Sequence, residues 1–166
     1  MTPVMIRRAT VEDLQSVTEL WKKMMQYHLS FDPRFDLAYH SDETYQKYLI
    51  SILNNYDYAV FVADLDGELV GYTIGMILSN PPVFSLERYG FISEMAVTET
   101  QQRHGVGRML WNHVQRWFHR RGITVIQLNV SPSNKRGYNF WKKVGCNEFL
   151  HILWHDIPRN LPKNAD

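Results

Sequence analysis

Gln102-Arg103-His104-Gly105-Val106-Gly107 is the stretch that decides the fold, because it joins an expected strand to an expected helix. The residues before it, 91–97, are rich in apolar side chains. The residues after it carry apolar side chains on one helical face, at Val106, Met109, Leu110, Val114, Trp117 and Phe118. The sequence therefore predicts a strand, a glycine turn and a helix in succession.

The glycine turn has the features of an anion site. Backbone N–H groups in the first turn of a helix have no partner within that helix. Glycine lets a ligand approach the backbone closely, and the helix dipole favours negative charge at this end. Arg103, His104 and Arg108 would add positive charge. We expect a phosphate or pyrophosphate here; the alternative is that Gly105 and Gly107 only allow the chain to turn.

Two common phosphate motifs do not match the turn. A dinucleotide fingerprint needs a third glycine at position 110, which is Leu110. A P-loop needs Gly-Lys-Ser/Thr, whereas Gly107 is followed by Arg108 and Met109. These two kinds of phosphate site are therefore set aside.

Two motifs in order between Ile92 and Cys146 resemble those of the GNAT superfamily of N-acetyltransferases. The first is Gln-x-x-Gly-x-Gly at positions 102–107. The second is Asn-x-x-Ala-x-x-Phe-Tyr followed by a glycine, which Asn134, Phe140 and Gly145 match. The resemblance implies an enzyme that uses acetyl-coenzyme A as co-substrate.

The resemblance also implies the fold class, α/β (α+β) in the GNAT acyltransferase arrangement. That arrangement is a mixed, mostly antiparallel sheet of about six or seven strands flanked by about four helices, with splayed central parallel strands. The order of expected elements agrees with it. Strands are expected at 4–8, 58–63, 69–78, 89–97, 123–130 and 148–156, and helices at about 10–29, 42–53, 106–121 and 134–144. We expect one domain, 1–158, and a tail, 159–166.

The resemblance assigns cofactor contacts residue by residue. The pyrophosphate of acetyl-coenzyme A would lie on the turn formed by Gln102, Arg103, His104, Gly105, Val106, Gly107 and Arg108. Pantetheine would pair with the main chain of Met95, Ala96 and Val97 as an added strand. Asn134 would hydrogen-bond the pantetheine arm, or cap a helix, or do both.

Three positions depart from the family pattern and bear on catalysis. Gly137 replaces an alanine, and Trp141 stands where the family has a tyrosine that protonates the departing thiolate. Trp141 could orient the sulfur but could not give up a proton, so Tyr138 or water is the substitute acid. Ser93 occupies the place of a glutamate in some relatives.

Glu94 is the candidate general base for the attacking amine. Because strand side chains alternate, Glu94 would point opposite to Ser93 unless a bulge re-aims it. The alternative for Glu94 is a carboxylate paired with a neighbouring cation.

Composition limits the classes of partner. The chain has 166 residues and a net charge of +1, which gives no general attraction to nucleic acid or to an anionic membrane. Its one cysteine, Cys146, fits a reducing, cytoplasmic compartment and a buried structural thiol. No metal motif is present, since His151 and His155 on one expected strand lack a third ligand.

The predicted function is transfer of an acetyl group from acetyl-coenzyme A to a primary amine of a small molecule or peptide, by direct attack. The aromatic and acidic residues between Tyr27 and Tyr45 are the expected acceptor side and favour a small cationic amine. The alternative is a non-catalytic GNAT-fold module that binds coenzyme A or an acyl form. The resemblance also leaves a homodimer possible.

Overall fold

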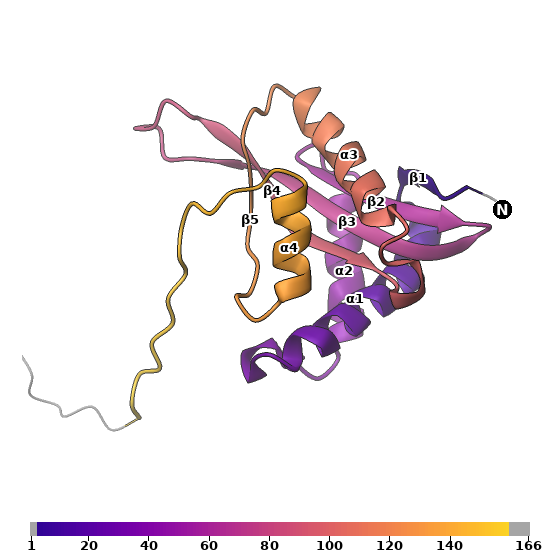
Figure 1. Ribbon diagram of the computed structural model, residues 1–166, viewed down its shortest axis with the longest axis horizontal. Helices are drawn as coiled ribbons and strands as arrows, with labels where there is room; N and C mark the ends of the chain where they lie inside the picture. Colours follow the sequence, from indigo (N-terminus) through magenta and orange to yellow (C-terminus); the bar gives the residue numbers. More distant parts are fainter. Residues whose placement is uncertain (1–2, 160–166) are drawn as a thin grey trace, which may run out of the picture.

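The computed structural model describes residues 3–159 and shows a sheet covered by helices on both faces (Figure 1). The sheet has five strands in the order β1-β2-β3-β4-β5, antiparallel except for the parallel pair β4 and β5. The strands are β1 (Met5–Arg8), β2 (Tyr58–Leu65), β3 (Glu68–Ser79), β4 (Arg88–Val97) and β5 (Ile126–Leu128). The helices are α1 (Leu14–Leu29), α2 (Ser41–Leu53), α3 (Val106–His119) and α4 (Lys135–Lys143).

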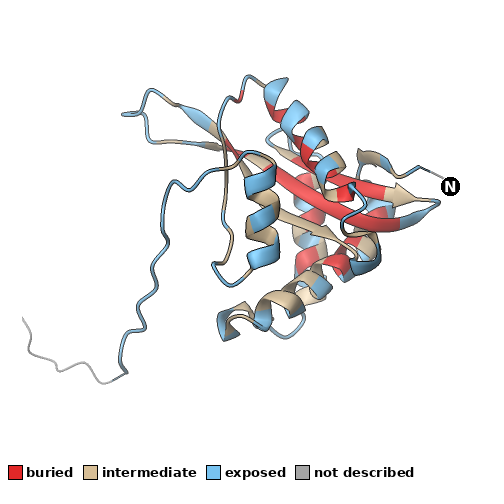
Figure 2. Ribbon diagram, in the orientation of Figure 1, coloured by how far each residue is buried: buried red, intermediate tan, exposed pale blue. Residues whose placement is uncertain are grey.

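Each face of the sheet has its own apolar core. On one face, Leu110, Val114 and Phe118 of α3 pack against residues of β2, β3 and β4, with Trp141 of α4 beside them. On the other face, Val17 of α1 and Leu49 of α2 pack against alternate residues of the same strands. Figure 2 shows the buried residues along the central strands and on the helix sides that face them.

Local sequence explains how the elements begin and end. The hairpin between β2 and β3 turns at Asp66 and Gly67, both with positive φ, as the Asp-Gly pair predicts. Gly122, with φ of 71°, follows the end of α3. Thr10 and Asp13 form the capping box of a 3-10 turn that leads into α1.

A β-bulge in β4 decides which side chains face which core. The register with β3 passes from Ile92 opposite Gly75 to Glu94 opposite Ile74, so Ser93 is the additional residue. The Ile92 side chain packs in the core on the α3 side of the sheet. Side chains two residues apart share one face of a regular strand, so without the bulge the Glu94 side chain would face α3 as well. The bulge instead turns Glu94 and Ala96 towards α1 and α2, and Met95 and Val97 towards α3.

The prediction of a strand at 148–156 is wrong. Residues 147–158 are extended but pair with no strand among the described residues, so the sheet has five strands rather than six or seven. The β5 segment is also shorter than the expected 123–130. A strand forms only where a neighbour accepts its hydrogen bonds, and the apolar pattern alone does not supply that neighbour.

Smaller expectations at the ends of elements also need correction. His40, in a left-handed conformation, precedes α2 as its N-cap, and the expected cap Ser41 is already helical. Cys146 is half-buried and outside any strand, so it is not the buried strand thiol that we expected. Of the expected tail only Arg159 is described; 160–166 lie outside the described residues.

Among residues 3–159, no helix has the length and apolar content needed to cross a membrane.

Candidate active site

The candidate site begins where β4 and β5 diverge. Their parallel pairing covers only Gly90 to Ile92 on β4, although β4 continues to Val97 along β3. Beyond Ile92, the β5 side of β4 therefore has no neighbouring strand within the described residues. This is the splayed pair that the family resemblance implies, and it leaves one edge of β4 open to a ligand.

Main-chain groups of β4 point into this open edge at alternate residues. The Thr98 N–H donates to the Val70 carbonyl at 2.9 Å, so the main-chain groups of Thr98 face β3. In an antiparallel ladder the facing alternates, which directs the N–H and C=O groups of Val97 and Met95 away from β3. An extended ligand could thus pair with Met95 and Val97 as a strand does.

The glycine turn lies at the end of this edge and is rich in unpaired N–H groups. Arg103 and Gly105 have positive φ values of 64° and 89°, and Gly105 is the N-cap of α3. No acceptor among residues 3–159 bonds the amide N–H of any residue from Arg103 to Arg108. These donors lie at the positive end of the α3 dipole, an arrangement that can bind an anion.

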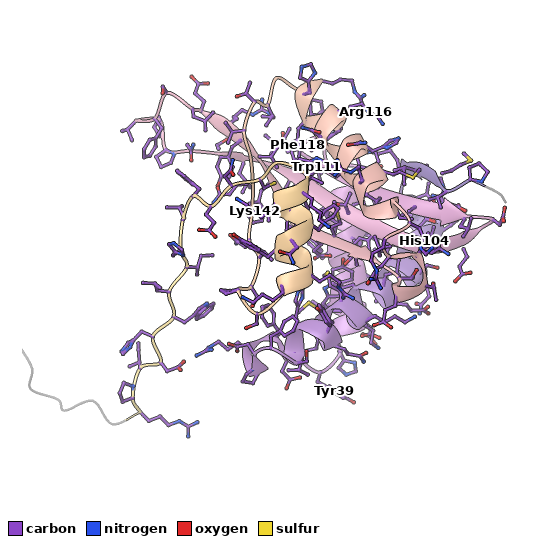
Figure 3. The ribbon with its side chains drawn as sticks, viewed as in Figure 1. Tyr39, His104, Trp111, Arg116, Phe118 and Lys142 are labelled. Atoms are coloured by element: carbon purple, nitrogen blue, oxygen red, sulfur yellow. The ribbon has the colours of Figure 1, made fainter. Side chains whose placement is uncertain are left out.

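Gln102 fixes the turn against β4. Its Nε2 donates to the Val97 carbonyl at 2.9 Å, and its Oε1 accepts from Nη1 of Arg136 at 2.7 Å. The Arg136 guanidinium also lies 4.4 Å from the ring centre of Tyr27 in α1. Arg136 at the start of α4 thus reaches both the turn and α1 across the open edge. Figure 3 places His104 at the start of α3.

Glu94 lies on the face of β4 that is turned towards α1 and α2, in a cluster with two tyrosines. Its Oε2 accepts hydrogen bonds from the hydroxyls of Tyr45, at 2.5 Å, and Tyr72, at 2.7 Å. Tyr45 comes from α2 and stacks on Trp21 of α1, with ring centres 4.0 Å apart. Within the described residues, Glu94 Oε1 accepts no hydrogen bond, which leaves it able to receive a proton.

Burial governs the protonation of this cluster. Desolvation raises the pKa of Glu94 above its ordinary value, while the hydrogen bonds from Tyr45 and Tyr72 act in the opposite direction. Desolvation and the Glu94 charge raise the pKa of both tyrosines, so their hydroxyls stay protonated as donors. Burial also raises the pKa of Tyr48 to about 12. A carboxylate with a raised pKa is a better proton acceptor than an exposed one.

The predicted residues on α4 have other partners in this structure. Trp141 packs edge-to-face on Trp111 of α3, with ring centres 5.7 Å apart. The hydroxyl of Tyr138 donates to Glu148 at 2.7 Å, which raises the tyrosine pKa. Asn134 caps α4 by accepting from the Gly137 N–H at 2.9 Å.

The local structure explains why glycine replaces the family's alanine at position 137. A Cβ at this position would lie 2.6 Å from Nδ2 of Asn134, so glycine lets the capping side chain fold over the start of α4. The cap predicted for Asn134 is confirmed, whereas its contact with pantetheine stays a prediction.

The expected acceptor stretch divides into inward and outward parts. Tyr45 is buried beside Glu94, whereas Tyr39 is exposed (Figure 3). Tyr27 and Phe31 pack edge-to-face at 4.7 Å, and His28 stands beside Phe35. Burial lowers the pKa of His28. The stretch therefore supplies an aromatic surface near Arg136 as well as one partner of Glu94.

The structure therefore places Met95, Val97 and the glycine turn along one open edge and turns Glu94 of the same strand towards Tyr45 and Tyr72, while Tyr138 is paired with Glu148. Sequence analysis missed the role of Tyr72, a buried hydroxyl within the mainly apolar strand β3. Its polarity at a buried position is the one signal that could have found it. Within residues 3–159, no three His, Cys, Asp or Glu side chains gather as metal ligands.

Comparison with known proteins places this geometry in a family. The family described as "Acetyltransferase (GNAT) family" matches residues 16–146. The N-alpha-acetyltransferase of Sulfurisphaera tokodaii is 32% identical over 119 residues, which cover 68% of this chain and 71% of the relative. The N-alpha-acetyltransferase of Sulfolobus acidocaldarius is 33% identical over 119 residues, with coverage of 68% and 70%.

Solved structures share the fold at low identity. A variant of the BH1408 protein of Bacillus halodurans superposes with a TM-score of 0.81 at 19% identity, covering 93% of this chain and 99% of that one. The aminoglycoside N-acetyltransferase AAC(6')-Iy in complex with CoA gives a TM-score of 0.76 at 20% identity, covering 95% and 96%. With its splayed β4 and β5, its glycine turn and these matches, the chain belongs to the GNAT superfamily of N-acetyltransferases.

Proposed function

We propose that the protein transfers the acetyl group of acetyl-coenzyme A to a primary amine of a small molecule or peptide. One juxtaposition carries the proposal. The open edge of β4, with Met95 and Val97 facing it, leads to the unpaired N–H groups of the glycine turn, and Glu94 comes immediately before Met95 on the same strand. The turn suits the pyrophosphate, the edge suits pantetheine and the carboxylate suits an ammonium group losing its proton.

The reaction proceeds by direct attack. The amine nitrogen forms a bond to the thioester carbonyl carbon while the Met95 N–H stabilises the developing oxyanion. Glu94 Oε1 receives the proton that the nitrogen loses, directly or through water. The carbon–sulfur bond then breaks, and the thiolate takes a proton from water or, as a second candidate, from Tyr138. Positioning of the reactants supplies most of the rate enhancement.

The α-amino group of a peptide is the first acceptor to test. The relatives at 32% and 33% identity are N-alpha-acetyltransferases, whereas the aminoglycoside enzymes share only the fold at this level of identity. The aromatic surface at Tyr27 and the guanidinium of Arg136 border the acceptor side. We also expect a cytoplasmic location, from the single cysteine.

The test is release of free thiol from acetyl-coenzyme A, with and without a panel of peptides, polyamines and aminoglycosides. Acetylation should depend on one class of amine, and Glu94→Gln should lower kcat by about 100-fold or more, as loss of a general base does. A thermal shift with coenzyme A alone tests the cofactor site separately. No stabilisation by coenzyme A would contradict the cradle at residues 103–108.

A non-catalytic module that binds coenzyme A is the second candidate. The placement of Trp141 favours it, because this side chain packs on Trp111 and offers no acid to the departing sulfur. Stabilisation by coenzyme A with no acetylation of any amine in the panel would support this candidate over the enzyme.

A further inference from the structure

Charge is divided unequally along the chain, although the net charge is only +1. Residues 100–147 contain nine of the 18 lysines and arginines and none of the 17 aspartates and glutamates. The rest of the chain therefore has nine basic residues against 17 acidic ones. The net charge alone predicted no attraction to nucleic acid, but an asymmetry of this kind is typical of a chain with one surface that meets a polyanion.

The basic segment folds into one surface. Its two helices, α3 and α4, cover the same face of the sheet (Figure 1). Arg108 joins them, because its Nη2 donates to the Lys143 carbonyl at 3.2 Å. Every exposed residue of the two helices is an arginine, lysine, histidine, asparagine or glutamine. We call these exposed residues, together with Arg120 and Arg121 at the end of α3, the basic face. Figure 3 places Arg116 on α3 and Lys142 on α4.

The basic face lacks the mixture of charges that is typical of a solvated helix. On the other side of the sheet, the exposed residues of α1 and α2 include both acids and bases, such as Glu19, Lys23, Glu43 and Lys47. Neither α3 nor α4 has an acidic residue in its first turn. Lys135 even begins α4, where the helix dipole disfavours a cation. Helix stability alone therefore does not account for the charge of this face.

The arginines at the C-terminal end of α3 have no carboxylate partner. Within residues 3–159, no aspartate or glutamate pairs with Arg116, Arg120 or Arg121. Burial and the nearby charge of Arg121 lower the pKa of Arg8 on β1. Guanidinium groups placed this close repel each other, and a phosphate oxygen that accepts hydrogen bonds from them relieves the repulsion.

Tyr56 adds an exposed aromatic ring to this end of the face. The Arg121 guanidinium lies 4.7 Å from the ring centre of Trp117 and 4.6 Å from that of Tyr56. The Trp117 ring is buried, whereas Tyr56 is 69% exposed. The cation–π contact thus holds the Tyr56 ring in place and leaves it accessible for stacking.

This end of the basic face lies apart from the proposed donor site. An α-helix rises about 1.5 Å per residue, so Arg116 and Arg120 are about 14 and 20 Å along α3 from Gly107. Phosphates of coenzyme A at the glycine turn therefore leave these arginines for another ligand.

We propose that the basic face binds single-stranded RNA. Its lysines and arginines contact phosphates, and the Tyr56 ring stacks on a base. The exposed amides of Asn112 and Gln115 bond ribose 2′-hydroxyls and base edges. An anionic membrane fits less well, because no exposed apolar side chain of α3 or α4 is present to enter lipid. This binding is independent of acetyl transfer.

The test is fluorescence polarisation of a labelled 20-nucleotide RNA of mixed sequence, titrated with the full-length protein with and without saturating coenzyme A. The wild type should bind with a Kd of about 1–100 µM near physiological salt in both conditions. The logarithm of the association constant should fall with the logarithm of salt concentration, with a slope of about −0.7 for each phosphate contacted. No RNA binding, or binding that coenzyme A abolishes, overturns the proposal.

Two pairs of substitutions locate the binding surface. Arg116→Ala combined with Arg120→Ala removes two phosphate contacts, so the salt slope should become about 1.4 less steep. Lys23→Ala combined with Lys47→Ala is the matched control, since it removes the same charge from exposed residues of α1 and α2 and should bind RNA as the wild type does. Thermal unfolding checks that both variants are folded. An equal effect of the two pairs would show attraction to net charge alone and exclude the basic face.

A third variant and a set of competitors test the kind of ligand. Tyr56→Leu should weaken RNA binding about 5-fold or more at every salt concentration without changing the slope, because it removes stacking and no charge. Full affinity in this variant would contradict the stacking. Polyglutamate, vesicles containing phosphatidylserine, and DNA of the same sequence should each compete less well than unlabelled RNA. Equal or stronger competition by any of them would exclude single-stranded RNA as the preferred ligand.

Discussion

Replacing Tyr72 by phenylalanine should move the pH dependence of the reaction. Tyr72 is completely buried, and its hydroxyl donates to Glu94 Oε2 at 2.7 Å. Phenylalanine keeps the ring and its packing but removes this donor from the carboxylate. Because the hydrogen bond lowers the pKa of Glu94 and desolvation raises it, the variant should have an even higher Glu94 pKa.

The size of the shift follows from the strength of the bond. A hydrogen bond to a charged group contributes about 1.5–3 kcal/mol, and 1.36 kcal/mol corresponds to one pKa unit, so the change is about 1–2 units. A general base must be deprotonated to act. The acid limb of kcat/KM should therefore move up by about 1–2 pH units, with similar activity above the limb.

The assay is kcat/KM across the pH range for the wild type, Tyr72→Phe and Glu94→Gln. Tyr58→Phe serves as the control, because Tyr58 packs in the same core and its hydroxyl makes no bond to Glu94. An acid limb that stays in place in Tyr72→Phe would refute the assignment of Glu94 as base. So would a Glu94→Gln variant that keeps both its activity and the wild-type limb.

Further perturbations test other parts of the structure. Gly75→Ala should cost about 1–3 kcal/mol in chemical unfolding, because a Cβ would lie 2.7 Å from the Val114 side chain; unchanged stability would contradict this close approach. Arg7→Ala should cost about 1–3 kcal/mol at neutral pH, because buried Asp13 loses its partner and Arg7 itself is partly exposed. Arg7 holds the pKa of Asp13 low, so the stabilisation is present above the carboxyl pKa of the unfolded chain and is lost as the pH falls through the folded pKa. The urea unfolding curves of the wild type and Arg7→Ala should therefore converge in acid. Gln102→Ala should weaken coenzyme A binding by about 2–10-fold in calorimetry, since the turn loses its hydrogen bond to β4. The control Gln101→Ala should leave binding unaltered.

Local patterns predicted most of the fold. The helical faces of α1 and α3, the Asp-Gly hairpin and the glycine turn each follow from residues close in sequence. The splayed strands follow from the Gln102–Gly107 motif through its family resemblance, whereas anion binding at this turn stays a prediction. The sequence did not predict whether β4 contains a bulge at Ser93, because no single residue there requires one.

Features that depend on distant partners escaped prediction. The hydroxyls of Tyr45 and Tyr72 reach Glu94 from α2 and β3, and no spacing in the sequence indicates that these elements meet. Residues 149–154 show the same limit in reverse, since they have a strand pattern but no strand partner among the described residues. The family position of Trp141 likewise did not predict its packing on Trp111.

The bulge at Ser93 has a consequence for how this protein could diversify. Before the bulge, even-numbered residues of β4 such as Ile92 face α3. After the bulge, even-numbered residues such as Ala96 face α1 and α2. In the proposed reaction, donor recognition uses main-chain atoms and the turn, whereas the surface towards α1 and α2 is built from side chains such as Glu94 and Tyr45. Substitutions on that surface can change the accepted amine without disturbing donor recognition. Under the proposed function, one inserted residue thus lets donor and acceptor recognition change independently, and deleting Ser93 would turn the Glu94 side chain towards α3.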